Sequence, residues 1–183
     1  MATSPRRIYW DACVWIALIQ KEKIRDDAGR TTEDRDMMCR AVIEAAKRGQ
    51  IEILTSTLSL VEVCKDPAIK VQPADAVADY FENDYILLVN VDRAVGERAR
   101  ALMTGGHAGL KPQDAIHLAS AAISGVEELH TFDRKLLNLD AVVDKTDGTK
   151  LKICKPDPGG PPAPLLAGLT KGPPDDKASD PGA

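Results

Sequence analysis

Short apolar runs alternate with longer amphipathic stretches along the first 155 residues of the chain. The short runs are rich in β-branched and aromatic residues, which predicts strands, whereas apolar positions at helical spacing in the longer stretches predict helices. The expected strands are residues 8–10, 51–55, 86–91, 128–132 and 151–154. The expected helices are residues 14–24, 32–48, 58–65, 73–81, 93–103 behind an Asp92 cap, and 112–123 with Pro112 in the first turn.

Strands that alternate with helices are typical of an α/β fold, in which helices cover both faces of a parallel sheet. Residues 156–183 have a different composition, because they hold eight of the chain's twelve prolines and five glycines. Such a segment buries too little apolar surface to offset the entropy of ordering it. We therefore expect one folded domain over residues 1–155 and a disordered tail over residues 156–183.

Composition narrows the possible functions. The formal net charge is −4, which argues against a broad basic surface for nucleic acid, and the aromatic content of 4% argues against extended base-stacking platforms. The four cysteines form no CxxC pair, so reduced thiols and a cytoplasmic location are expected. No apolar run approaches the roughly 20 residues that span a membrane, so we expect no membrane partner.

Four acidic residues stand out by their surroundings. Asp11 follows the first expected strand and Asp133 follows the fourth, while Glu62 interrupts an apolar helix and Asp114 lies in a first helical turn. Each has a structural alternative. Asp11 and Asp133 could cap helices, Asp114 could complement a helix dipole, and Glu62 could face solvent.

In parallel α/β sheets, sites form beyond the carboxyl ends of the strands, so these acids could converge on one cleft. Two like charges about 4 Å apart repel by roughly 4 kcal/mol at an effective dielectric of 20, and a divalent cation removes that repulsion. Oxygen ligands suit Mg²⁺ or Mn²⁺, which can activate water for phosphodiester hydrolysis. Thr131 could position a water or a ligand carboxylate through its hydroxyl, or it could simply bond locally within its strand.

Other polar residues near these acids each have a functional and a structural interpretation. Lys111, Arg134 and Lys135 adjoin two of the acids and could contact phosphates, or they could be solvated surface charges. His117 lies three residues after Asp114 and could be a metal ligand, although a packed or exposed helical histidine is the simpler interpretation. Neither a GxSxG nucleophile motif nor a GxxxxGK[ST] phosphate loop occurs.

At these acids the chain resembles the PIN-domain family of nucleases, and within it the VapC-like toxins of bacterial toxin–antitoxin pairs. The matching segments are residues 8–11, 58–63, 114–119 and 131–134. They carry the family's four acidic positions in the same order, within a matching strand and helix context. The resemblance spans residues 8–154.

The resemblance implies a three-layer α/β/α sandwich with a central parallel sheet of four to five strands. It implies RNA cleavage that depends on Mg²⁺ or Mn²⁺, with Thr131 supporting the metal-binding acids. Those acids would be Asp11, Glu62, Asp114 and Asp133. The implied partners are an RNA substrate, a second copy of the chain in a homodimer, and an antitoxin protein that occludes the cleft.

The chain departs from the family pattern just after Asp11. Family members often have a hydroxyl residue and then Asn there, whereas this chain has Ala12 and Cys13. The Pro-rich tail is also no part of the pattern. These departures leave the hydrogen bonding around Asp11 open but do not affect its carboxylate.

The prediction from the sequence is a metal-dependent endoribonuclease that cleaves RNA phosphodiester bonds by metal-activated water and acts as a toxin. One alternative is a non-toxin PIN nuclease in RNA processing. Another is a catalytically silent module that binds RNA or protein, against which the presence of all four acids argues. A receiver-like phosphoryl-transfer domain would need a clustered acidic pair near the first strand, where only Asp11 stands.

Overall fold

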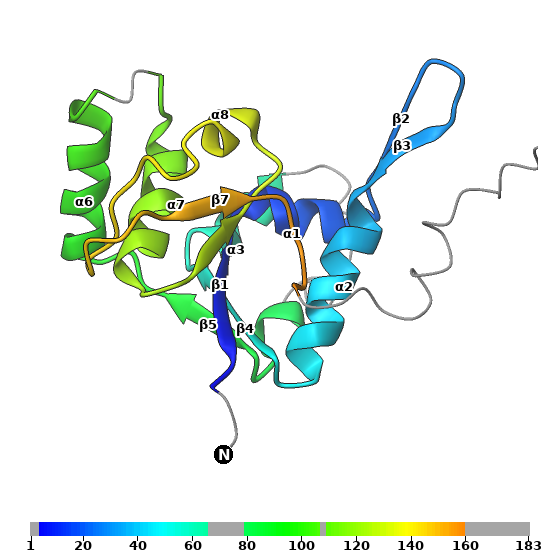
Figure 1. The fold of residues 1–183 in the computed structure, drawn as a ribbon, viewed down its shortest axis with the longest axis horizontal. Helices are drawn as coiled ribbons and strands as arrows, with labels where there is room; N and C mark the ends of the chain where they lie inside the picture. Colours follow the sequence, from blue (N-terminus) through cyan, green and yellow to red (C-terminus); the bar gives the residue numbers. More distant parts are fainter. Residues whose placement is uncertain (1–3, 66–78, 107–108, 160–183) are drawn as a thin grey trace, which may run out of the picture.

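The computed structural model describes residues 4–65, 79–106 and 109–159 of the chain (Figure 1). The main sheet contains β1 (Arg6–Trp10), β4 (Ile51–Ser56), β5 (Ile86–Val89), β6 (Glu128–His130) and β7 (Lys152–Cys154). A separate pair is formed by β2 (Lys23–Arg25) and β3 (Thr31–Asp34). The helices are α1 (Ala12–Ile19), α2 (Arg35–Lys47), α3 (Ser59–Glu62), the 3-10 turn η1 (Val63–Lys65), α6 (Arg93–Thr104), α7 (Pro112–Ile123) and α8 (Arg134–Leu137).

The five strands of the main sheet run parallel in the order β5-β4-β1-β6-β7. Strand β1 lies at the centre, where Ile8 pairs with Ile53 of β4 and Tyr9 pairs with Leu129 of β6. Because all five strands point the same way, their carboxyl ends share one edge of the sheet. The predicted α/β/α sandwich with four to five parallel strands is confirmed, with five strands.

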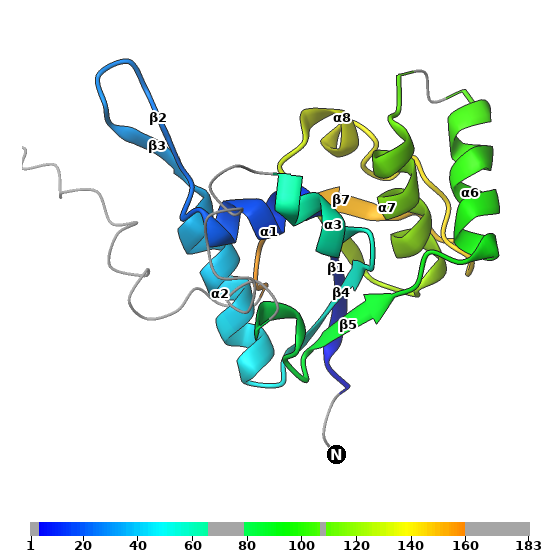
Figure 2. The same cartoon turned by 180° about the vertical axis from the view of Figure 1, so that it is seen from behind.

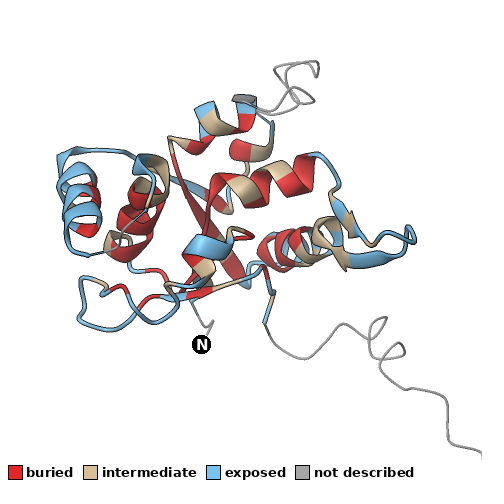
Figure 3. Ribbon diagram, turned by 90° about the horizontal axis from the view of Figure 1, so that it is seen from above, coloured by how far each residue is buried: buried red, intermediate tan, exposed pale blue. Residues whose placement is uncertain are grey.

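Alternating side chains of β1 divide the core into two layers. Ile8 and Trp10 pack in a cluster with residues of α1 and α2, whereas Tyr9 packs in a second cluster with residues of α6 and α7. The two helical layers lie on opposite sides of the sheet (Figures 1 and 2). Buried residues lie along the sheet and on the helix sides that face it (Figure 3).

The largest difference from the sequence prediction is an antiparallel hairpin between the first two helices. Helix α1 ends at Ile19 rather than at residue 24, and α2 begins at Arg35 rather than at residue 32. Lys21 has a φ of 54°, which the right-handed helix does not allow, so the chain leaves α1 there. The hairpin of β2 and β3 then projects from the body beside α2 (Figure 1).

Three strands are shorter than predicted, and β7 differs only in beginning at Lys152 rather than at residue 151. Strand β5 ends at Val89, and it lies at the edge of the sheet, so Leu87 and Leu88 remain 37% and 41% exposed despite the apolar sequence. Strand β6 ends at His130, which places the next three residues in the loop beyond the sheet.

Two predictions fall largely outside the described residues. Of the helix predicted over residues 73–81, only residues 79–81 are described, and they are helical. Of the tail over residues 156–183, only residues 156–159 are described, so its disorder and the domain boundary remain predictions. In the ranges that the structure covers, no helix has the length and apolar character needed to cross a membrane.

Candidate active site

Asp11 and Asp133 both follow strands at the carboxyl edge of the sheet, and both cap helices. Asp11 is the N-cap of α1, where its Oδ1 accepts a hydrogen bond of 3.2 Å from the backbone N–H of Val14. Asp133 is the N-cap of α8, where its Oδ1 accepts from the N–H groups of Lys135 and Leu136 at 2.6 and 3.3 Å. The structural alternatives are therefore correct for both residues. Each cap engages one carboxylate oxygen, so capping fixes these groups without preventing a second role.

Thr131 joins these two acids. Its buried hydroxyl donates to Oδ2 of Asp11 at 2.6 Å and accepts from the backbone N–H of Asp133 at 2.9 Å. Thr131 thus bonds locally, although in the loop beyond β6 rather than within a strand, and it also orients the Asp11 carboxylate; its support of a metal ligand stays a prediction.

Cys13 resolves the departure from the family pattern beside Asp11. Its thiol donates to Oδ1 of Asp11 at 2.9 Å and accepts from the backbone N–H of Phe132 at 3.1 Å. Burial, followed by the charge of Asp11, raises the pKa of the Cys13 thiol, so the sulfur keeps its proton and remains a donor. A donor to the Asp11 carboxylate is therefore present even though the usual asparagine is absent.

Glu62 ends helix α3, beyond the carboxyl end of β4, and its carboxylate contacts α7. Its Oε2 lies 2.7 Å from Nε2 of His117, and Nδ1 of the same ring lies 2.9 Å from the Tyr9 hydroxyl. His117 is 3% exposed, so the interpretation as a packed histidine is correct in its burial. Sequence reasoning missed its pairing with Glu62.

Asp114 lies in the first turn of α7, as predicted, and its Oδ2 is buried without a hydrogen-bond partner among the described residues. Burial raises the pKa of Asp114, and the negative charges of Asp133 and Asp11 raise it further, while Lys111 opposes them. Asp114 is therefore close enough to both other aspartates to feel their charge.

Three of the predicted acids, Asp11, Asp114 and Asp133, thus belong to one electrostatic neighbourhood, and Glu62 adjoins it through His117, whose charge also acts on Asp11. Burial also raises the pKa of Asp11, and the neighbouring His117 ring and the hydrogen-bond donors around the carboxylate oppose the rise. Within the described ranges, no lysine or arginine forms an ion pair with Asp11, Asp114 or Asp133. In the part of the chain that the structure describes, these three aspartates are therefore gathered without the ion-paired cations that usually compensate buried carboxylates.

Comparison with known proteins identifies the family. A family model described as PIN domain matches residues 8–142. This chain belongs to the PIN-domain family. No curated protein matches the chain.

Among solved structures, this PIN domain is similar to the VapC20 toxin of Mycobacterium tuberculosis, described as a sarcin–ricin loop cleaving toxin. The two chains share 18% sequence identity with a TM-score of 0.51, and the match covers 69% of this chain and 90% of the other. At that identity the match supports the fold.

The acidic neighbourhood of this PIN domain fits a hard divalent cation. Its donors are carboxylate oxygens, one of which, in Asp114, is buried without a partner. None of the four acids belongs to a group of three ligand atoms within 4.8 Å of one another in the described part of the chain. Mg²⁺ keeps several waters when it binds a protein, so its ligand carboxylates do not all have to lie in direct contact with one another.

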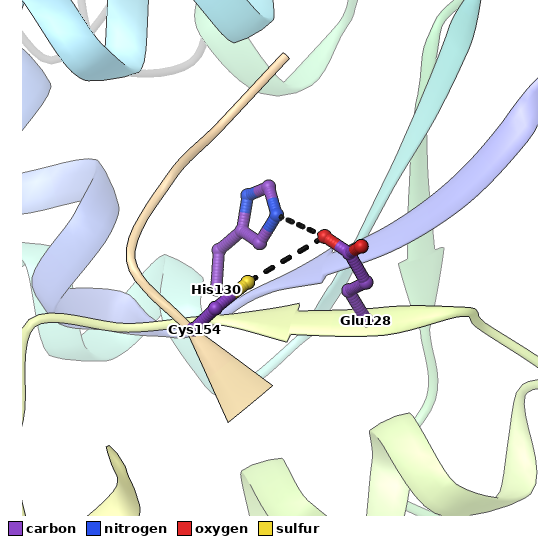
Figure 4. Close-up of side chains that lie close together, drawn as sticks. All are labelled: Glu128, His130 and Cys154. Carbon is purple, nitrogen blue, oxygen red and sulfur yellow. Dashed lines mark hydrogen bonds and ion pairs between the residues drawn. The ribbon is translucent and has the colours of Figure 1, made fainter. Parts of the chain in front are cut away.

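A tighter cluster lies within the sheet, and it was not predicted. Ligand-type atoms of Glu128, His130 and Cys154 lie within 4.8 Å of one another (Figure 4). Nδ1 of His130 accepts a hydrogen bond from the Trp10 indole at 3.2 Å, and its Nε2 lies 3.0 Å from Glu128. Because an indole N–H only donates, a neutral His130 carries its proton on Nε2.

That tautomer argues against a metal at this cluster. Coordination through Nε2 would move the proton to Nδ1, where it would face the indole N–H of Trp10. Glu128 is already paired, because its Oε1 lies 2.8 Å from Nζ of Lys152 and 3.7 Å from Arg6. The cluster therefore holds β6, β7 and the start of β1 together. The alternation of Glu128 and His130 along one strand was a signal in the sequence, but pairing with Cys154 required the sheet order.

Proposed function

We propose that this PIN domain is a metal-dependent endoribonuclease. The observation that carries the proposal is the partnerless buried oxygen of Asp114, which lies in the electrostatic reach of Asp11 and Asp133. Buried carboxylates without compensating cations destabilise a fold, so their position at a strand-end edge points to chemistry rather than packing.

Each side chain has a role in this proposal. The acids that would hold Mg²⁺ or Mn²⁺ are Asp11, Glu62, Asp114 and Asp133. When bound, the cation would activate a water molecule and offset negative charge at the scissile phosphate. Thr131 and Cys13 keep Asp11 oriented through the bonds that they donate. Water adds across the bond between phosphorus and the 3′ oxygen, which leaves with a proton, so the products carry a 5′ phosphate and a 3′ hydroxyl.

Three basic residues beside the acids are candidates for phosphate contacts. Lys111 precedes α7, while Arg134 and Lys135 open α8, and all three side chains are exposed. A few such contacts, together with a bridging cation, allow a protein of net charge −4 to bind a polyanion.

The toxin role and the partners rest on the similarity to VapC20. That protein is described as cleaving the sarcin–ricin loop, which supports structured RNA as the substrate of this chain. We propose a protein antitoxin and a second copy of the chain as partners. Exposed apolar side chains of α3, with Leu60 and Val61 39% and 64% exposed, support contact with another protein.

Cleavage of a short RNA hairpin by the purified protein with Mn²⁺ tests the function. We expect fragments with 5′ phosphates and 3′ hydroxyls, and no cleavage by Asp11→Asn, whose circular dichroism spectrum should stay near native. Asp27→Asn is the matched control, because Asp27 is exposed on the turn of the hairpin, away from the acids. A 2′,3′-cyclic phosphate, or full activity of Asp11→Asn, would contradict the proposal.

A further inference from the structure

His117 is a buried polar residue that is neither one of the proposed metal ligands nor one of the candidate phosphate contacts. It lies on α7 between a core tyrosine of β1 and the candidate ligand Glu62 of α3. These three elements are distant in the sequence, and His117 is separated from Tyr9 by 108 positions and from Glu62 by 55. The ring is therefore placed by the tertiary fold rather than by its own helix.

The direction of the hydrogen bonds follows from the chemistry of the three groups. An ionised Glu62 carboxylate only accepts, so the proton of this pair belongs to Nε2 of His117. In the neutral ring Nδ1 is then the acceptor, and the Tyr9 hydroxyl donates to it. Burial raises the pKa of Tyr9, which keeps that hydroxyl protonated. Glu62 thus selects the tautomer, and the Tyr9 hydroxyl satisfies the acceptor nitrogen on the other side of the ring.

We propose that His117 is a positioning residue, which holds the carboxylate of Glu62 at the acidic site through its Nε2 proton, with the ring oriented by Tyr9. This inference rests on the proposed function. Helix α3 is only four residues long, and a glutamate side chain loses considerable rotamer freedom when it is fixed, so a donor from another element helps to hold it.

The type of donor that holds Glu62 affects how well its carboxylate can bind a cation. A carboxylate has two oxygens with about four acceptor sites, so a bond to Oε2 leaves capacity for a cation. A lysine or arginine in the same place would hold Glu62 but would also supply a full positive charge, as Lys152 does for Glu128. An imidazole N–H can fix the carboxylate and still leave acceptor sites on its oxygens for a cation.

Mn²⁺ binding without RNA tests the inference, because that readout does not depend on turnover. His117→Leu removes the donor, and we expect about 10-fold weaker Mn²⁺ binding in calorimetry. His117→Gln keeps an N–H that can reach Glu62, and we expect it to recover most of the affinity. Tyr9→Phe keeps the imidazole donor but removes the hydroxyl that orients the ring through Nδ1, so a smaller loss is expected. Native affinity in His117→Leu, or equal losses in His117→Leu and His117→Gln, would overturn the proposal.

A second measurement covers the case in which His117→Leu does not fold. Nitrogen-15 NMR of the unaltered, metal-free protein should show the proton of His117 on Nε2, and Glu62→Gln should shift that signal. A proton confined to Nδ1, or a signal that Glu62→Gln leaves unchanged, would overturn the positioning role. If instead the unaltered protein binds no Mn²⁺, the proposed function fails, and the NMR result still reports on the contact between His117 and Glu62.

Discussion

The Glu128 cluster within the sheet and the acids at its carboxyl edge both contain buried or half-buried carboxylates, but the surroundings of these carboxylates are opposite in character. Glu128 receives hydrogen bonds from His130 and Lys152 and lies near Arg6, so its pKa is held well below the ordinary value, first of all by the bond from His130. Asp114 has a buried oxygen with no partner, and its pKa is raised by burial and by neighbouring acids.

The difference separates a structural carboxylate from a candidate ligand. Glu128 lies inside the ladder between β6 and β7, where its charge is balanced and where His130 has both ring nitrogens engaged. Asp11 and Asp133 at the carboxyl edge are oriented by a hydroxyl, a thiol and backbone N–H groups, and neither forms an ion pair with a lysine or arginine of the described residues. Oriented but uncompensated carboxylates are suited to a cation, which would supply the missing positive charge.

Removing one carboxylate from each group should produce the sharpest contrast. Asp114→Asn should lower RNA cleavage by about 10²-fold or more, since it removes a ligand to the cation that would stabilise the transition state. Glu128→Gln should leave cleavage within about twofold, because it lies outside the site. Initial rates at saturating Mn²⁺ measure both. Equal losses in the two variants would abolish the distinction between the groups.

Thermal unfolding with and without Mn²⁺ should show a second difference between Asp114→Asn and Glu128→Gln. A ligand that binds only the folded state stabilises it by about 2.7 kcal/mol at 100 times its Kd. We expect that gain in the native protein and in Glu128→Gln, and little gain in Asp114→Asn. If Mn²⁺ still stabilises Asp114→Asn but no longer stabilises Glu128→Gln, the metal binds at the Glu128 cluster, which contradicts the proposed site.

The positions of the acids at the carboxyl edge could be predicted from the sequence, because they follow from where the strands and helices begin and end. Asp11 and Asp133 were predicted at the carboxyl edge from the apolar runs that precede them, and Asp114 from the proline that opens its helix. Their proximity follows from the parallel sheet. Whether these acids bind a cation remains a prediction.

The rest depended on contacts between segments far apart in the sequence. His117 has the spacing of a core residue, and only the fold shows that its ring reaches Glu62. Cys154 joins Glu128 only because β7 lies beside β6. The hairpin of β2 and β3 was missed because its charged residues also fit a continued helical pattern, and a single residue with positive φ, Lys21, redirects the chain.

The stability of Glu128→Gln should fall by about 1–2 kcal/mol, because hydrogen bonds to a charged group are lost, although exposure of Lys152 reduces the cost. The lowered pKa of Glu128 makes its contribution present above the ordinary glutamate pKa and lost as the pH falls toward the folded-state value. The deficit of Glu128→Gln relative to the native protein should therefore shrink below about pH 4.5. Urea denaturation across that window measures it.

Asp114→Asn should show the opposite pH dependence. Since the folded-state pKa of Asp114 is raised, its ionised form destabilises the fold above the ordinary aspartate range, and the native protein recovers that stability as the pH falls and the carboxyl is protonated. Asp114→Asn should therefore match or exceed the native protein in stability at neutral pH without metal, and lose that advantage in acid. A variant less stable than the native protein at pH 7 would show that Asp114 is a structural carboxylate after all.

The smallest expected effect concerns the thiol that stands where the family often has asparagine. Cys13→Ser keeps a donor within reach of Asp11 Oδ1 and should retain Mn²⁺ affinity, whereas Cys13→Ala removes the donor and should weaken binding a few-fold, with a stability cost of about 0.5–1.5 kcal/mol. Calorimetry on the two variants decides, with the exposed Cys64→Ala as the control. If Cys13→Ala binds Mn²⁺ as tightly as Cys13→Ser, the thiol only fills space, and Thr131 and the α1 backbone suffice to orient Asp11.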